Sequence, residues 1–277
     1  VGTTSPWGQL SINPNGITGP AFVIGSSTAT KFIVDNGGNV GIGRSGALSS
    51  RLDITNSATS SAVITLRDPL GNVSVELRAG TSTLFNTFVG SSAGASNTTG
   101  SNNTANGNIA FSKNTIGGRN TANGYAALWS NITGDDNTAT GYNALLGNSS
   151  GIRNTANGAL ALTSNTTGTF NTANGYAALQ STGFGIGNTA NGYFALNGNT
   201  TGSYNVGVGY LAGNNVSTGY DNIFLGHDAN GGGNAITTGF NNIGLGYNIK
   251  FPAVSSSNML NIGNFLFANL PATTTST

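Results

Sequence analysis

Short apolar runs alternate with turn-forming residues in the first 85 residues of the chain. The separating segments are rich in Asn, Asp, Gly and Pro, as at Asn15-Gly16 and Asp68-Pro69. Such a pattern predicts short β-strands joined by tight turns. We expect these strands at residues 9–12, 22–24, 32–34, 62–66 and 73–77. No segment of the chain shows the 3.6-residue period of an amphipathic helix.

From residue 86 the pattern changes to a strict repeat of 17 residues. Each repeat, called a rung below, opens with the pentad Asn-X-X-X-Gly. The leading Asn recurs at Asn86, Asn103, Asn120, Asn137, Asn154, Asn171, Asn188, Asn205 and Asn222. A longer rung containing Gly231, Gly232 and Gly233 follows, and the pattern resumes at Asn242. A short fixed period predicts one structural unit stacked on copies of itself.

A second Gly recurs 14 residues after the leading Asn, as at Gly134, Gly151 and Gly168. Two Gly residues at fixed phase predict two corners in each rung, where a positive φ or a close backbone approach is required. Two corners and two short strands make one turn of a β-solenoid, with a perimeter of about 56 Å. The fold class expected is therefore all-β: a β-solenoid (β-roll) of 17-residue rungs preceded by a strand-rich β module. The domains expected are residues 1–85, 86–257 and 258–277.

The interior of such a narrow rung is expected to be small. Ala recurs seven residues after the leading Asn, and Leu follows it in five rungs. The Ala residues are Ala110, Ala127, Ala144, Ala161, Ala178, Ala195, Ala212 and Ala229. Ala buries little apolar surface, whereas ordering the backbone costs about 1–2 kcal/mol per residue. We therefore expect the chain to bury more surface by forming a homotrimer.

The second and fourth pentad positions form two polar columns with aliphatic ends. Val, Ile and Leu occupy both positions from Val206 onward, as at Ile223 and Leu225. This substitution predicts inward-facing columns, in which stacked side chains form a hydrogen-bonded ladder. The ladder residues are Thr104, Asn106, Thr121, Asn123, Thr138, Thr155, Asn157, Thr172, Asn174, Thr189 and Asn191. The alternative is a flat outward array that organises water, as in an ice-binding protein.

Aromatic residues recur directly after the pentad. This column consists of Tyr125, Tyr142, Tyr176, Tyr193, Tyr210 and Tyr247. The rings are expected to stack on one another or to seal a subunit interface, and the alternative is a strip that stacks on sugar rings of surface glycans. His227, the only histidine, falls in the same column. Because nothing indicates a catalytic triad around it, we do not expect an enzyme.

Composition narrows the partners. Charged residues are 6% of the chain, the net charge is +1 and cysteine is absent. A near-neutral chain has no electrostatic footprint for nucleic acid, and no apolar run is long enough for membrane insertion as a helix. We therefore expect no nucleic-acid partner and no membrane insertion. A polar chain without cysteine favours an extracellular, cell-surface or virion-fibre location.

Two further patterns concern ligands and modification. Asp135-Asp136 and Asp228 with Asn230 place oxygen atoms in turns, but each site supplies few carboxylates for Ca²⁺. No metal and no cofactor is therefore expected, with Ca²⁺ as the alternative. Asn-X-Ser/Thr sequences recur at Asn97, Asn131, Asn148, Asn165, Asn199 and Asn215. Turn formation explains these Asn residues more simply than glycosylation does.

Both ends of the chain carry apolar residues. These are Trp7, Leu10 and Ile12 near the start and Leu260, Ile262, Phe265 and Phe267 near the end. A solenoid with open ends exposes unpaired strand edges. We expect these residues to join subunits head to tail, with a strand pair at 259–263 and 265–267 at the C-terminal end. Such a heterologous contact produces a filament.

The rung sequence carries a resemblance to known surface proteins. Asn-Thr-Ala-X-Gly-Tyr-X-Ala-Leu followed by Asn-Thr-Thr-Gly, as at residues 165–168 and 171–179, resembles the repeats of tail-fibre-like bacterial and phage surface proteins. It is also similar to the β-roll repeats in the heads of trimeric autotransporter adhesins. The resemblance implies a structural subunit of an extracellular fibre or surface appendage. The alternative that it implies is an adhesin or tail-fibre shaft that binds surface glycans. The middle rungs depart from the adhesin pattern, because they carry Thr and Asn where adhesin heads favour aliphatic residues.

Overall fold

The chain divides into two compact units, Val1–Val63 and Ile64–Thr277. The computed structural model describes residues 22–26, 29–34, 40–42, 52–54, 64–67, 73–79, 84–231 and 235–269. All regular elements in these residues are β-strands. The expected strand at 9–12, with Trp7, Leu10 and Ile12, lies outside the described residues.

The first unit contains one four-stranded sheet in the order β1-β2-β3-β4. Its strands are β1 (Phe22–Ser26), β2 (Ala29–Val34), β3 (Val40–Ile42) and β4 (Leu52–Ile54). β1, β2 and β3 pair antiparallel, and β4 pairs parallel with β3. The strands predicted at residues 22–24 and 32–34 are thus confirmed.

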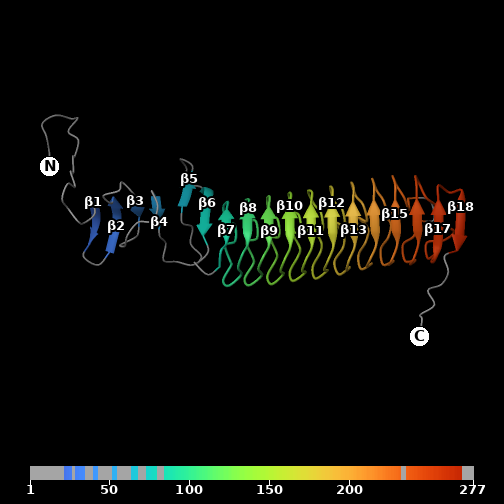
Figure 1. The fold of residues 1–277 in the computed structure, drawn as a ribbon, viewed down its shortest axis with the longest axis horizontal. Helices are drawn as coiled ribbons and strands as arrows, with labels where there is room; N and C mark the ends of the chain where they lie inside the picture. Colours follow the sequence, from blue (N-terminus) through green and yellow to red (C-terminus); the bar gives the residue numbers. More distant parts are fainter. Residues whose placement is uncertain are drawn as a thin grey trace, which may run out of the picture. The chain divides into compact units, whose positions relative to one another are not determined.

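The second unit is a β-solenoid built on a single 14-stranded sheet. It opens with the antiparallel hairpin of β5 (Ile64–Arg67) and β6 (Val73–Ala79), which pairs antiparallel with β7 (Thr87–Val89). Parallel strands follow in order along the chain (Figure 1). They are β8 (Thr104–Asn106), β9 (Thr121–Asn123), β10 (Thr138–Thr140), β11 (Thr155–Asn157), β12 (Thr172–Asn174), β13 (Thr189–Asn191), β14 (Val206–Val208), β15 (Ile223–Leu225), β16 (Ile243–Leu245) and β17 (Met259–Ile262).

The last strand, β18 (Leu266–Asn269), turns back and pairs antiparallel with β17. This hairpin confirms the strand pair expected at the C-terminal end. The sheet nevertheless extends beyond both expected boundaries of the repeat region. β5 and β6 belong to the same compact unit as the rungs, and β17 stacks on β16 as one more parallel strand.

Each rung contains one three-residue strand, and the prediction of two strands per rung is wrong. On the opposite side of the rung, alternate residues adopt left-handed conformations, such as Ala126 at φ 53° and Leu128 at φ 52°. The N–H groups of these two residues bond to different rungs, one to the preceding rung and the other to the following rung. Ala126 donates to the carbonyl of Asn108 at 3.1 Å, and Leu128 donates to that of Ala144 at 3.0 Å. The rungs are thus hydrogen-bonded here too, without forming regular strands.

The two Gly corners are confirmed. The pentad Gly residues have positive φ, as at Gly124 (φ 133°), and a side chain there would run into the backbone of Gly141 in the next rung. The second Gly is required by space alone. A Cβ on Gly134 would lie within 3.0 Å of both the Gly151 carbonyl oxygen and Asn131 Oδ1. Only Gly allows such an approach of successive rungs.

The core is a narrow row of small side chains, as expected. The predicted Ala column and the Leu residues that follow it are completely buried. A second buried column runs along the middle residues of the strands, such as Ala105, Ala122 and Ala139. Towards the C-terminal end, larger side chains fill the interior. Phe224 lies between strands whose middle residues are Gly207 and Gly244, and it contacts Phe251 edge-on at 6.1 Å between ring centroids.

Candidate functional site

The second and fourth pentad side chains face outward, and the prediction of inward ladders is wrong. In each strand of β8–β13 the middle residue is buried, whereas its two neighbours are exposed or half-buried. Adjacent residues of a strand point to opposite faces, and the narrow interior accommodates the Ala between them. The residues affected are Thr104, Asn106, Thr121, Asn123, Thr138, Thr155, Asn157, Thr172, Asn174, Thr189 and Asn191. Together with Thr140 they form the outer surface called the Thr/Asn face below.

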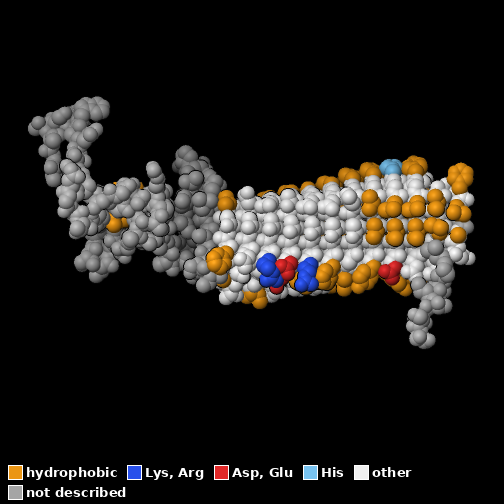
Figure 2. Space-filling view, in the orientation of Figure 1, with side chains coloured by type: hydrophobic (Ala, Val, Ile, Leu, Met, Phe, Trp, Pro, Cys, Tyr) orange, Lys and Arg blue, Asp and Glu red, His pale blue; other side chains and the backbone are white. Residues whose placement is uncertain are grey.

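The aliphatic residues at the second and fourth pentad positions also face outward and continue the Thr/Asn face. Their apolar character was the reason for predicting that these columns face inward. They form an aliphatic block on β14–β17, which Figure 2 shows as two files at the C-terminal end of the face. Val208 is 38% exposed, Leu225 40% and Ile262 41%. The members are Val206, Val208, Ile223, Leu225, Ile243, Leu245, Leu260 and Ile262. Exposed apolar side chains in one contiguous group mark a surface suited to contact with another molecule.

The buried hydrogen-bonded ladder is formed by the leading Asn of each pentad, which the sequence analysis treated only as a marker of phase. Asn188 shows the pattern. Asn188 Oδ1 accepts two hydrogen bonds from Asn205, one from the backbone N–H at 3.0 Å and one from the side-chain Nδ2 at 3.2 Å. Its Nδ2 donates to the carbonyl of Gly202 at 2.9 Å. Each Asn thus connects one rung to the next and closes the corner of its own rung.

A second buried Asn column lies opposite the leading one at the same corner. Asn131 Nδ2 donates to Asn114 Oδ1 at 2.9 Å and to the Gly134 carbonyl at 3.0 Å. The column is interrupted where the next rung has Thr182 or Val216. At these two places the buried Oδ1 atoms of Asn165 and Asn199 have no hydrogen-bond partner.

This second column contains five of the six Asn-X-Ser/Thr positions named in the sequence analysis. Asn97 is 8% exposed, and Asn131, Asn148, Asn165 and Asn199 are completely buried. Their Nδ2 atoms donate to Gly carbonyls, as Asn148 does to Gly151 at 3.1 Å. A glycan cannot be attached to a buried and bonded nitrogen, so turn formation explains these positions. The recurrence of Asn at two positions of the rung, strict at the first and interrupted at the second, was the sequence signal for the two columns.

The aromatic column stacks on itself. Ring centroids are 5.4 Å apart for Tyr125–Tyr142 and for Tyr176–Tyr193, with interplanar angles of 13° and 14°. His227 is part of the column, because it stacks on Tyr210 at 5.0 Å and on Tyr247 at 5.1 Å. The stack is interrupted at Ala159, which occupies the column position between Tyr142 and Tyr176. The rings remain exposed at their edges, with Tyr176 44% and Tyr247 67% exposed.

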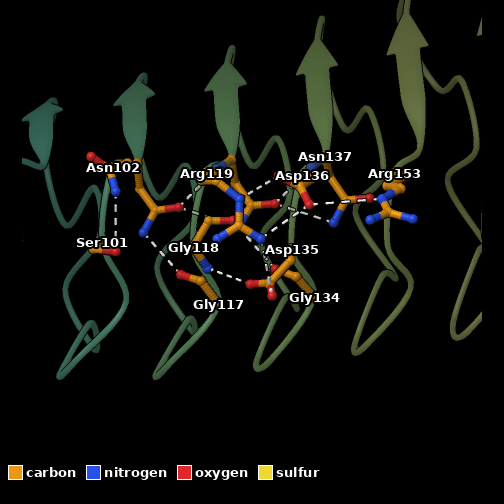
Figure 3. Close-up of polar contacts among 12 residues, drawn as sticks. Ser101, Asn102, Gly117, Gly118, Arg119, Gly134, Asp135, Asp136, Asn137 and Arg153 are labelled. Atoms are coloured by element: carbon orange, nitrogen blue, oxygen red, sulfur yellow. Dashed lines mark hydrogen bonds and ion pairs between the residues drawn. The ribbon is translucent and has the colours of Figure 1, made fainter.

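Charged side chains gather at one corner of three successive rungs (Figure 3). Arg119 binds Asp136 with two nitrogens and lies 3.5 Å from Asp135, while Arg153 Nε lies 3.9 Å from Asp136. The hydrogen bond from Arg119 lowers the pKa of Asp136, and the same bond raises the pKa of Arg119. Asp135 accepts a hydrogen bond from the Gly118 N–H at 2.7 Å. Asp135 and Asp136 were the first Ca²⁺ candidate of the sequence analysis, and both carboxylates already have protein partners.

The second Ca²⁺ candidate is also internally bonded. Asn230 is buried, and its side chain exchanges hydrogen bonds with the backbone of Ile236. Among the described residues, no group of three or more His, Asp or Glu side chains is placed to hold a metal ion. The expectation that the protein has no cofactor stays a prediction.

The four C-terminal residues that were expected to join subunits lie on the final hairpin. The side chain of Phe265, in the turn between β17 and β18, is 98% exposed. Leu260 and Ile262 belong to β17 and point outward with the aliphatic block, and the side chain of Phe267 lies outside the described residues. Within the described part of the chain β18 pairs with β17 alone, so its other edge is open.

Comparison with known proteins gives no relative. No family model, no curated protein and no solved structure matches the chain. The described residues contain no helix with the length and hydropathy needed to cross a bilayer.

Proposed function

We propose that the protein is a structural subunit of an extracellular fibre or surface appendage that assembles by trimerisation and head-to-tail stacking. The observation that carries this proposal is the open end of the sheet. β18 leaves one strand edge unpaired in the described residues, and Phe265 stands almost fully exposed beside it. An open edge with an exposed aromatic side chain is suited to adding the strand of another subunit.

The rungs supply what a fibre shaft needs. Backbone hydrogen bonds and the leading Asn column connect each rung of the repeat to the next, as between Asn120 and Asn137 at 2.9 Å. At a subunit joint, the unpaired backbone edge of β18 is available to a strand of the next subunit. A non-closing contact of this kind extends without limit.

The aliphatic block supports the lateral association of chains. Its eight side chains lie on the outer face of four successive strands, where the remainder of the face is polar. Three chains that bring these blocks together remove apolar surface from water, at roughly 25 cal/mol per Å². A thin core of Ala and Leu gains most from such burial. An extracellular or cell-surface location and the absence of enzymatic activity are parts of the same proposal.

Head-to-tail assembly is tested by replacing the exposed aromatic residue at the end of the solenoid. Phe265→Lys places a charge at the joint without removing a buried contact. We expect it to shift the protein from long filaments to short particles in analytical ultracentrifugation at equal concentration. Phe184→Lys is the matched control, because Phe184 is 62% exposed in a middle rung. If Phe265→Lys assembles as readily as the control, the end of the solenoid is not the joint.

A second candidate function, glycan binding by a shaft of an adhesin or tail fibre, is favoured by the gap in the ring column. Stacked rings cover each other's faces, but Ala159 leaves one face of Tyr142 and one of Tyr176 uncovered. Two rung spacings separate these rings, about 9.6 Å. The slot is therefore about as wide as one sugar ring stacked on both sides.

Ala159→Tyr closes this slot and continues the stack. If the protein binds glycans there, wild-type protein gives a glycan-array signal that Ala159→Tyr loses. The matched control is Asn108→Tyr, which adds a ring at the same column position two rungs before Tyr142 and leaves the slot open. An array without signal for the wild-type protein would contradict this candidate and leave the fibre proposal intact.

A further inference from the structure

The Thr/Asn face is a regular polar array whose side chains make only one hydrogen bond to the protein among the described residues. It presents twelve side chains in two files on the six strands β8–β13. The strands pair parallel and in register, so Thr follows Thr across the sheet, as Thr155 follows Thr138. The face carries no charged side chain.

The hydroxyls of this face differ from those of several Thr residues in the turns of the solenoid. Thr115 and Thr166, in the turns, donate to carbonyls of the next rung at 3.1 and 2.9 Å. In the part of the chain that the structure describes, no Thr hydroxyl of the face makes a bond to protein. Within the face, the bond between the side chains of Asn157 and Asn174, at 3.0 Å, is the one such contact. The array therefore directs its hydrogen-bonding capacity to water.

The spacing of the array is close to that of ordered water. Neighbouring strands lie about 4.8 Å apart. In a tetrahedral water network with oxygens about 2.8 Å apart, second neighbours are about 4.6 Å apart. Successive rungs thus present hydroxyl and methyl groups at nearly the interval at which a lattice of water repeats. Because the leading Asn column and the Gly corners fix each rung, little ordering of the protein is needed on binding.

We propose that the Thr/Asn face binds the surface of crystalline ice. The site consists of the outward side chains of β8–β13, with the Thr that opens each of the six strands as its regular file. Their hydroxyls bond to lattice water while their methyl groups fill the gaps between lattice positions. The face ends at Val206, where the aliphatic block begins and the file loses its hydroxyls. Ice binding is separate from fibre assembly, because the proposed function places assembly at the end of the solenoid and at the aliphatic block.

The test is the partition of purified full-length protein into slowly growing ice, together with the freezing-point depression below the melting point. We expect the wild-type protein to enter the ice phase and to hold back crystal growth. Thr155→Tyr puts a bulky ring in the middle of the array. We expect it to reduce the difference between the melting point and the freezing point at least tenfold. Thr167→Tyr is the control, because Thr167 is exposed in the same rung but lies off the face.

Folding of each variant is checked by its circular dichroism spectrum and unfolding midpoint. If Thr155→Tyr does not fold, Thr172→Tyr on the next strand replaces it. Wild-type protein that stays in the liquid overturns the proposal, and so does equal activity of the face variant and the control. Electron microscopy of the same preparation keeps the two proposals apart. Filaments without ice binding contradict this inference alone, and ice binding without filaments contradicts only the fibre proposal.

Discussion

Glycine and asparagine have separate roles at the corners of each rung. Gly allows successive rungs to approach so closely that a single added carbon would collide with backbone, as at Gly134. Asn then uses this proximity, because the short distance lets one amide reach both its own rung and the next. Gly134 O, for example, accepts hydrogen bonds from Asn120 at 2.8 Å and from Asn131 at 3.0 Å. Close approach and polar satisfaction are therefore linked at the level of single residues.

The corner Gly predicts a large effect of a small substitution. Gly134→Ala is expected to lower the free energy of unfolding by about 1–3 kcal/mol, because the new methyl group has to displace backbone. Gly183→Ala is the control, since its Cβ would meet its nearest neighbours at 3.9–4.0 Å. We expect the control to change stability by less than about 0.5 kcal/mol. Urea unfolding midpoints measure both, and equal midpoints would contradict the close-approach explanation.

At the scale of the elements, the inner and outer sides of one strand differ in what their Asn residues do. Asn188 precedes β13 and is completely buried in the ladder, whereas Asn191 ends β13 and is exposed. Both belong to the same pentad, three residues apart. Substituting each of the two residues therefore distinguishes the contribution of the buried ladder to stability from the general effect of losing an Asn side chain.

Asn188→Ala is expected to be strongly destabilising and Asn191→Ala nearly neutral. The first removes the acceptor of the Asn205 N–H, and leaving a buried donor without a partner costs about 1–3 kcal/mol. The second removes only solvent-exposed contacts and is expected to change stability by less than about 0.5 kcal/mol. Thermal or urea unfolding of the two variants gives the comparison. Similar losses for both would show that the ladder does not hold the rungs together.

The charged corner predicts a small dependence of stability on pH. Arg119 lowers the pKa of Asp136 below its ordinary value of 3.8 in the folded protein. A lowered pKa contributes stability above the unfolded value, and this contribution is lost as the pH falls through the folded value. Wild-type protein is therefore expected to exceed Asp136→Asn in stability at neutral pH, and the difference should vanish in strong acid. Because the pair is exposed, high salt should reduce the difference at neutral pH. A difference that persists in acid would exclude the ion pair as its cause.

The repeat period was sufficient to predict the stacked rungs, the Gly corners and the buried Ala column. The orientation of the strand faces was predicted wrongly, because a three-residue strand offers only one alternation between its sides. Outward Val, Ile and Leu at β14–β17 imitate a core pattern, and the buried Ala at the middle of β8–β13 is what shows which side is inside. The left-handed residues were also missed, since Leu128 and Arg119 do not carry the Gly signature of a positive φ.

At the scale of the whole solenoid unit, one sheet runs from β5 to β18 and connects every rung by the same contacts. Its sides are chemically distinct: a Thr/Asn face, an aliphatic block beyond it and a stacked aromatic column (Figure 2). We propose that the open edge at β18 and the aliphatic block serve for association of the unit along its axis and across it. Together they make a trimeric filament the expected assembly.

Cryo-electron microscopy of the purified protein tests this central claim most directly. The account predicts continuous filaments with an axial repeat of one subunit, three chains in cross-section and a strong layer line near about 4.8 Å from the stacked rungs. Discrete particles one solenoid long at all concentrations would contradict head-to-tail assembly. Filaments one chain thick would contradict the trimer and leave the aliphatic block without its proposed role.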